Sequence, residues 1–151
     1  MTALPGLAAR RQALADRHPV WRRETLDRAF ARAAAEYPDR PFVIGDDATI
    51  SYAQAVAQAE VFARGLQAKG VGPGDRVALL GWNSHWLVET YLSPSVIGAI
   101  PVPLNHRLGF PELVELIADC TPKILIVDRH MAETGARLNR LPKASPQASP
   151  G

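Results

Sequence analysis

The stretch from residue 72 to residue 108 constrains the fold most strongly, because it places two short apolar runs on either side of a helix-length segment. The first run, residues 77–80, reads Val-Ala-Leu-Leu, and the second occupies residues 99–105. Short apolar runs between turn residues are typical of buried strands. Two such strands joined by a helix predict a βαβ unit, in which the strands are parallel and the crossover is right-handed.

Further elements flank this unit on both sides. They are helices over residues 25–37, 51–69, 111–121 and, more weakly, 129–140, a β-hairpin over residues 42–50, and a third parallel strand over residues 123–127. Helical or alternating spacing of apolar residues is the basis of each assignment. The expected fold class is therefore α/β with three layers: a mostly parallel sheet flanked by helices, with an N-terminal β-hairpin.

Cap and proline signals add detail to these elements. Thr25 is expected to cap the first helix, Ser51 forms a capping box with Gln54, and Asn83 or Ser84 caps the helix of the βαβ unit. Pro94 lies inside that helix and predicts a kink or a break, because proline removes a backbone donor. For the same reason, Pro101 and Pro103 predict an irregular second strand. Gly70 suits the left-handed residue after a helix.

The helical patterns also predict which side chains are buried. One helix should bury Tyr52, Val56, Ala59, Ala63 and Leu66, the next Trp86, Leu87, Tyr91 and Leu92, and a third Leu113, Leu116, Ile117 and Cys120. Trp82 and Trp86 could line a path for an acyl or pantetheine group. Large aromatic residues at a junction between strand and helix usually belong to the core, however, and Trp82 is expected there as well.

Length and composition exclude several classes of protein. A chain of 151 residues suits one domain, here residues 21–140, between a flexible lead-in over residues 1–20 and a disordered tail over residues 141–151. The single cysteine, Cys120, permits no internal disulfide and suits a cytoplasmic protein. No apolar segment is long enough to span a membrane, and no basic run interleaved with aromatics points to nucleic acid.

The central motifs resemble a known family. Residues 70–80 (Gly-Val-Gly-Pro-Gly-Asp-Arg-Val-Ala-Leu-Leu) and residues 98–108 (Gly-Ala-Ile-Pro-Val-Pro-Leu-Asn-His-Arg-Leu) are similar to the N-terminal region of adenylate-forming, AMP-dependent synthetases and ligases. Residues 50–52 (Ile-Ser-Tyr) resemble the first core motif of that family. Acyl-CoA synthetases are the nearest branch. The resemblance covers residues 25–128 and implies a fragment of the family's large N-terminal domain.

The resemblance also implies a function for the full-length relatives. Such an enzyme uses ATP and Mg²⁺ to convert a carboxylic acid into an acyl-adenylate, and then transfers the acyl group to CoA. The family's phosphate-binding loop, its adenine-binding motifs and its C-terminal catalytic lysine match no segment of this sequence. We therefore expect no activity, no catalytic residue and no cofactor for the chain alone. The alternative is a non-catalytic α/β interaction module or a remnant without enzymatic activity.

Three loops follow the expected parallel strands, and ligands of open α/β sheets bind at the ends of such strands. These loops contain Trp82 and His85, Asn105-His106-Arg107, and His130. The three histidines could converge on a metal ion or a proton-transfer site, or could be ordinary surface residues. Asn105 is expected to turn or cap the backbone after its strand, and Arg107 to pair with a carboxylate or a helix end. The alternative is that Trp82, Asn105, His106 and Arg107 are ligand-binding residues at this edge; no metal site is expected.

Two further features are interpreted structurally. Gly70, Gly72 and Gly74 precede a strand, whereas a phosphate-binding loop follows one, so they are expected to form a turn. The apolar run over residues 124–127 would form an exposed sheet edge unless later segments cover it. Exposed edges pair with other chains, so we expect self-association or aggregation through this strand.

Overall fold

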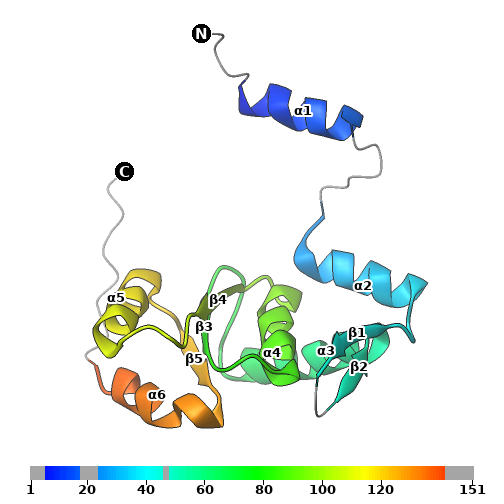
Figure 1. Ribbon diagram of the computed structural model, residues 1–151. Helices are drawn as coiled ribbons and strands as arrows, with labels where there is room; N and C mark the ends of the chain where they lie inside the picture. Colours follow the sequence, from blue (N-terminus) through cyan, green and yellow to red (C-terminus); the bar gives the residue numbers. More distant parts are fainter. Residues whose placement is uncertain (1–5, 18–23, 46–47, 142–151) are drawn as a thin grey trace.

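A computed structural model describes residues 6–17, 24–45 and 48–141 (Figure 1). Its elements are α1 (Leu7–Arg17), α2 (Leu26–Glu36), β1 (Pro41–Ile44), β2 (Thr49–Ser51), α3 (Tyr52–Ala68), β3 (Arg76–Leu80), α4 (His85–Val96), β4 (Ile100–Leu104), α5 (Phe110–Cys120), β5 (Ile124–Val127), the 3-10 turn η1 (Arg129–Met131) and α6 (Ala132–Asn139). Residues 142–151 of the expected tail and residues 46–47 of the hairpin turn lie outside the described residues.

The main sheet has the strand order β4-β3-β5, and both pairings are parallel. Alternate residues of the central strand β3 point to opposite faces. Val77 and Leu79 pack with Leu66 of α3 on one face. Ala78 and Leu80 pack with the residues that α5 and α6 bury on the other. Helices thus cover both faces of a parallel sheet (Figure 1), which confirms the three-layer α/β fold class.

The hairpin β1–β2 is antiparallel and lies apart from the main sheet (Figure 1). Three rings join it to the neighbouring helices: the Phe42 ring lies 4.7 Å from the Phe30 ring of α2 and 5.0 Å from the Tyr52 ring of α3. Such contacts between aromatic rings add to the gain from apolar burial. The hairpin is therefore held by an aromatic cluster of its own.

The caps follow the sequence closely. Ser51 and Gln54 form both hydrogen bonds of the predicted capping box at the start of α3. Ser84 caps α4, because its hydroxyl accepts a hydrogen bond from the backbone N–H of Leu87. Thr25 occupies the N-cap position of α2, but its side chain makes no capping hydrogen bond. Gly70 adopts a φ of 82°, as expected of the residue that ends α3.

The prolines disturb the structure less than predicted. Helix α4 is not broken at Pro94 but continues to Val96, and a kink at Pro94 stays a prediction. In β4 the pairing with β3 runs without interruption, so the expected irregularity is wrong. The backbone N–H of Ile100 donates to Asp75, and the alternation of a strand then turns the nitrogens of Pro101 and Pro103 away from β3. Proline is tolerated there because no donor is needed on that side.

Several burial predictions need correction. In α3 the buried side chains are Ala55, Ala59, Ala63 and Leu66, whereas Tyr52 and Val56 are only half-buried. In α5 Leu113 is buried but Leu116 is 39% exposed, because the helix turns Val114 and Ile117 toward the core instead. The structure also adds helix α1 within the expected lead-in, whose flexibility stays a prediction.

Candidate functional site

The carboxyl ends of the parallel strands bring three loops to one edge of the sheet. The loops follow β3 at Gly81, β4 at Asn105 and β5 at Asp128. This arrangement arises because all three strands run in the same direction. The three loops therefore lie at one edge, as the sequence predicted, and they contain Trp82, Asn105, His106 and Arg107. Ligand binding by this edge stays a prediction.

Three rings meet at this edge. The indole of Trp82 stacks on the imidazole of His130, with ring centroids 4.4 Å apart and an angle of 12° between the planes. The ring of His106 lies on the same indole at 6.1 Å and is tilted by 37°. Trp82 is 51% exposed. These three residues, here called the ring cluster, present aromatic surface to solvent at the end of the sheet.

Asp128 holds the backbone beneath the ring cluster. Its Oδ2 accepts a hydrogen bond from the backbone N–H of Trp82 at 2.7 Å, and its Oδ1 accepts one from Met131 at 2.9 Å. It thus caps η1 and ties the loop after β3 to the loop after β5. Gly81 makes room for this contact, because a Cβ atom there would lie 3.2 Å from the Asp128 side chain.

The surroundings of Asp128 favour its charged form. Burial alone would raise the pKa of its carboxyl group. The hydrogen bonds from the backbone N–H groups of Trp82 and Met131, with the positive charge of His130, outweigh burial and lower the pKa. Asp128 is therefore a carboxylate at neutral pH that accepts two fixed hydrogen bonds, which suits a positioning role.

The loop after β4 behaves as its sequence predicts. The side-chain oxygen of Asn105 accepts a hydrogen bond from the backbone N–H of Arg107 at 3.0 Å, which is an Asx turn. Arg107 itself is exposed. The turn therefore places a cationic side chain one residue after His106, a member of the ring cluster.

The three predicted histidines do not form one cluster. His106 and His130 both contact Trp82, whereas the ring of His85 lies 4.9 Å from the ring of Trp86. Within the described part of the chain, no three His, Cys, Asp or Glu side chains are grouped so that they could hold a metal ion. The structure thus gives the metal hypothesis no support.

The expectation of buried tryptophans at this junction is wrong. Trp82 is 51% exposed because it lies in the loop beyond the end of β3. Trp86 is 63% exposed and Tyr91 is 37% exposed, because α4 buries Glu89 and Leu92 instead. Large aromatic residues are usually buried, so the exposure of three rings on one loop and helix is a departure from the usual pattern.

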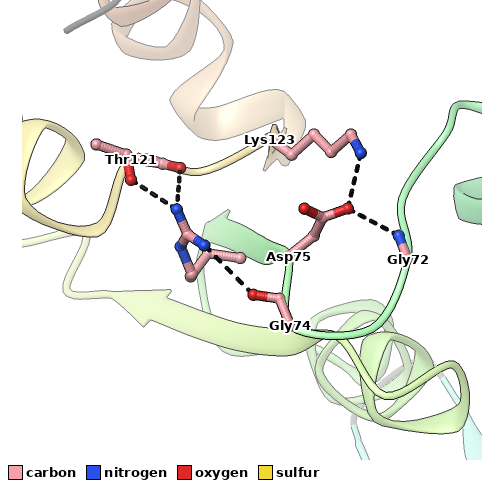
Figure 2. Close-up of polar contacts among 6 residues, drawn as sticks. Gly72, Gly74, Asp75, Thr121 and Lys123 are labelled. Atoms are coloured by element: carbon pink, nitrogen blue, oxygen red, sulfur yellow. Dashed lines mark hydrogen bonds and ion pairs between the residues drawn. The ribbon is translucent and has the colours of Figure 1, made fainter. Parts of the chain in front are cut away.

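The opposite edge of the sheet carries a polar network that the sequence did not reveal (Figure 2). The guanidinium of Arg76 donates to the backbone oxygen of Cys120 at 2.8 Å, and to the backbone oxygen and the hydroxyl of Thr121 at 3.1 and 2.7 Å. These carbonyls belong to the end of α5, where helix carbonyls lack partners within the helix. Arg76 therefore fixes α5 to β3.

Asp75 extends this network to β5. Its carboxylate accepts hydrogen bonds from Lys123 Nζ and from the backbone N–H of Gly72, both at 2.8 Å (Figure 2). The bond from Lys123, followed by the bond from Gly72, lowers the pKa of Asp75. Because this edge holds the amino ends of the strands, we interpret the network as structural.

The arrangement favours binding over catalysis. The ring cluster and Arg107 offer stacking surface and a positive charge, whereas Asp128 is fully engaged with backbone N–H groups. Asp128 and Gly81 were missed as site residues. The only signal was their place directly after two predicted strands, which is where parallel sheets hold functional loops.

Comparison with known proteins identifies the family. The family model described as AMP-binding enzyme matches residues 30–150. The chain belongs to this family. The match confirms the resemblance seen in the sequence motifs, and it covers all five strands and helices α3 to α6.

Curated relatives of this chain include CoA synthases and CoA ligases. It is 41% identical to a feruloyl-CoA synthase from Amycolatopsis sp over 107 residues, covering 71% of this chain and 22% of that protein. It is 33% identical to a medium/long-chain-fatty-acid–CoA ligase from Mycobacterium tuberculosis over 121 residues, covering 78% of this chain and 20% of that protein. The chain thus spans about a fifth of the length of these relatives.

Solved structures agree on the fold. A putative long-chain-fatty-acid CoA ligase from Rhodopseudomonas palustris matches with a TM-score of 0.74 and 31% identity, over 80% of this chain and 31% of that one. The O-succinylbenzoate Coenzyme A synthetase of Bacillus subtilis, in complex with AMP, matches with a TM-score of 0.66 and 25% identity, over 71% of this chain and 28% of that one. The fold is that of a part of the N-terminal domain of adenylate-forming enzymes.

Proposed function

We propose that this chain is the N-terminal part of an acyl-CoA synthetase. The whole enzyme would use ATP and Mg²⁺ to convert a carboxylic acid to an acyl-adenylate, with release of pyrophosphate, and then form a thioester with CoA. The observation that carries this proposal is the family match over residues 30–150, with CoA ligases among the relatives. We place the enzyme in the cytoplasm, because a chain with a single cysteine suits a reducing compartment. As a separate finding, none of the described helices is long and apolar enough to cross a membrane.

The carboxyl edge is the part of this chain that we assign to ligand contact. The ring cluster supplies a flat, half-exposed indole, and the Asn105 turn is followed by Arg107, one residue after His106 of the cluster. Together they suit a ligand with a planar or apolar portion and an anionic group. Phosphate chemistry needs cations and backbone donors aimed at the developing charge. The described residues of this edge offer no such set, so the catalytic groups would come from other parts of the enzyme.

A chimera tests this assignment. The segment of feruloyl-CoA synthase that aligns with this chain would be replaced by residues 30–128 of the chain, and formation of feruloyl-CoA would be measured. We expect a folded, active chimera, and an added Trp82→Ala change should raise the KM for one substrate. Ile44→Ala, at an exposed residue of the hairpin, is the matched control. A chimera with native circular dichroism but no activity would contradict the proposal.

The 151-residue chain alone should not form acyl-adenylates. The test is release of pyrophosphate with ATP, Mg²⁺ and a panel of fatty and aromatic acids, compared with a heat-inactivated sample. ATP should also bind weakly, because the glycine-rich turn precedes β3 and cannot aim a helix N-terminus at phosphate. A rise of several degrees in the melting temperature at millimolar ATP would reveal real binding and count against this expectation.

One observation favours a second function, that of a non-catalytic interaction module. β5 is an outer strand of the described sheet, and all four of its residues are only half-buried. An outer strand can pair with a strand of another chain. On this reading the partner is a second copy of the chain, and a folded but inactive chimera, together with self-association of the chain, would favour this function over the ligase.

A further inference from the structure

Glu89 is an unusual side chain in this fold. It lies on α4 and is 4% exposed, and no other Asp, Glu, Lys or Arg of the described residues is buried. Burial of a carboxylate is unfavourable unless hydrogen bonds or charges compensate it. Neither the ring cluster nor the polar network of Figure 2 includes Glu89. Its burial therefore needs a separate explanation.

Gln58 of α3 faces this carboxyl group across the interface between the two helices. With its amide nitrogen turned toward Glu89, Gln58 donates to Oε1 at 2.6 Å and to Oε2 at 3.0 Å. The same amide turned over presents its oxygen, which accepts a hydrogen bond from a protonated carboxyl group. Rotation of one amide thus provides a partner for either charge state of Glu89.

The charges around Glu89 are few. Among the titratable groups of the described chain, only His85, one helical turn earlier on α4, acts electrostatically on Glu89. α3 contributes the uncharged Gln58, and no charged group of α2 or of the sheet acts on Glu89. Burial raises the pKa of Glu89, and the positive charge of His85 opposes this shift without cancelling it.

We propose that Glu89 is a pH-sensitive link between α3 and α4: protonation of its carboxyl group strengthens the packing of the two helices, and ionisation weakens it. The proton comes from solvent, and Gln58 changes from acceptor to donor as the proton leaves. Because α3 also joins the hairpin to the sheet, the link controls how firmly these two parts of the molecule are held together.

The sign of the effect follows from linkage. A folded chain that holds a proton more tightly than the unfolded chain becomes less stable as pH rises between the two pKa values. For Glu89 that window opens at the ordinary value of 4.5 and extends upward. Asp128 and Asp75 have lowered pKa values, so they change the stability of the chain only near and below their ordinary pKa of 3.8, outside the window of Glu89.

Urea denaturation of the 151-residue chain between pH 4.5 and pH 8 tests the link. We expect the urea concentration at the denaturation midpoint of the wild type to fall as pH rises. In the Glu89→Gln variant this midpoint should no longer fall over the same pH range. Glu60→Gln, at an exposed glutamate of α3, should retain the fall. If Glu89→Gln and the wild type show the same pH profile, the proposal is overturned.

A second measurement needs no folded variant at position 89. The carboxyl carbon of Glu89 would be titrated by NMR in the wild type, with the side-chain amide of Gln58 followed in the same spectra. We expect both signals to share one midpoint above pH 4.5, and His85→Asn to move that midpoint higher. A Glu89 midpoint at or below 4.5 would overturn the proposal.

Discussion

Single side chains connect segments of this fold that are distant in sequence. Asp128 joins the loops after β3 and β5, and Arg76 joins β3 to the end of α5. Both side chains bond mainly to backbone groups, so their effect does not depend on a particular partner residue. This explains why neither was recognisable as important from the sequence: the partners are carbonyl and N–H groups that nearly every residue has.

Replacement of Asp128 by asparagine should weaken the carboxyl edge. The amide side chain would keep one acceptor oxygen but lose the other, and loss of one hydrogen bond to a charged group costs about 1–2 kcal/mol. Because the pKa of Asp128 is lowered in the folded chain, its contribution is present at neutral pH and is lost as pH falls through that pKa. Urea denaturation should therefore show that the variant loses more free energy of unfolding, relative to the wild type, at neutral pH than at acidic pH.

The control for this experiment is Asp119→Asn, at an exposed position of α5. It should leave the free energy of unfolding at neutral pH nearly unchanged. An Asp128→Asn variant as stable as the wild type at neutral pH would mean that Asp128 does not hold the loops together.

Arg76→Lys should destabilise the chain even though the charge is kept. A lysine cannot reproduce the fork of donors that reaches Cys120 and Thr121. We expect a loss of about 1–3 kcal/mol, because partly buried carbonyl groups at the end of α5 lose their partners. Thermal unfolding followed by circular dichroism measures it. Arg64→Lys, on the exposed face of α3, should have little effect, and equal losses in both variants would contradict this account.

At the scale of the helices and strands, the sequence predicted where each element lies along the chain better than which face of each helix is buried. The βαβ unit, the hairpin, β5 and the Ser51 capping box were all predictable, because turn residues and caps act over a few neighbouring residues. The exposure of Trp82 and Trp86 could not be predicted in this way, because it depends on how α4 packs on α3 and on the sheet. The ring cluster was predictable only as three loops at one edge, since side-chain stacking depends on the register of all three strands.

Two helical glycines allow a matched test of α6. A Cβ atom at Gly135 would lie 2.6 Å from Cγ1 of Val127 on β5, whereas a Cβ atom at Gly65 in α3 meets nothing within 4 Å. Gly135→Ala should therefore destabilise the chain by about 1–3 kcal/mol through overpacking. Gly65→Ala should stabilise it by about 0.5–1 kcal/mol, because alanine favours helix.

Urea denaturation of both variants provides the measurement. Opposite signs are expected, although the same atoms are added to both chains. A Gly135→Ala variant at least as stable as the wild type would show that α6 does not rest closely on β5, and that β5 lacks the cover that the structure gives it.

At the scale of the whole molecule, the two edges of the sheet differ. Pro101 and Pro103 leave the free side of β4 without N–H donors at these two positions. On β5, Asp128 donates its backbone N–H to Leu80, so the alternation of the strand turns the N–H group of Val127 away from β3. Edge strands with free donors are templates for pairing, whereas proline blocks it. This difference predicts that any association uses β5 rather than β4.

We therefore predict that the purified 151-residue chain self-associates at high micromolar concentration, and that Ile126→Lys lowers both its stability and the associated fraction. Ile126 is half-buried and packs against the α3 side of the sheet, so its replacement loses about 1.5–3 kcal/mol of apolar burial. The added charge also opposes pairing of two β5 strands. Size-exclusion chromatography with light scattering decides the matter, with Ile44→Lys, at a residue 78% exposed on the hairpin, as control. A stable wild-type monomer at that concentration would contradict the prediction and would mean that the cover from η1 and α6 is enough to protect the edge.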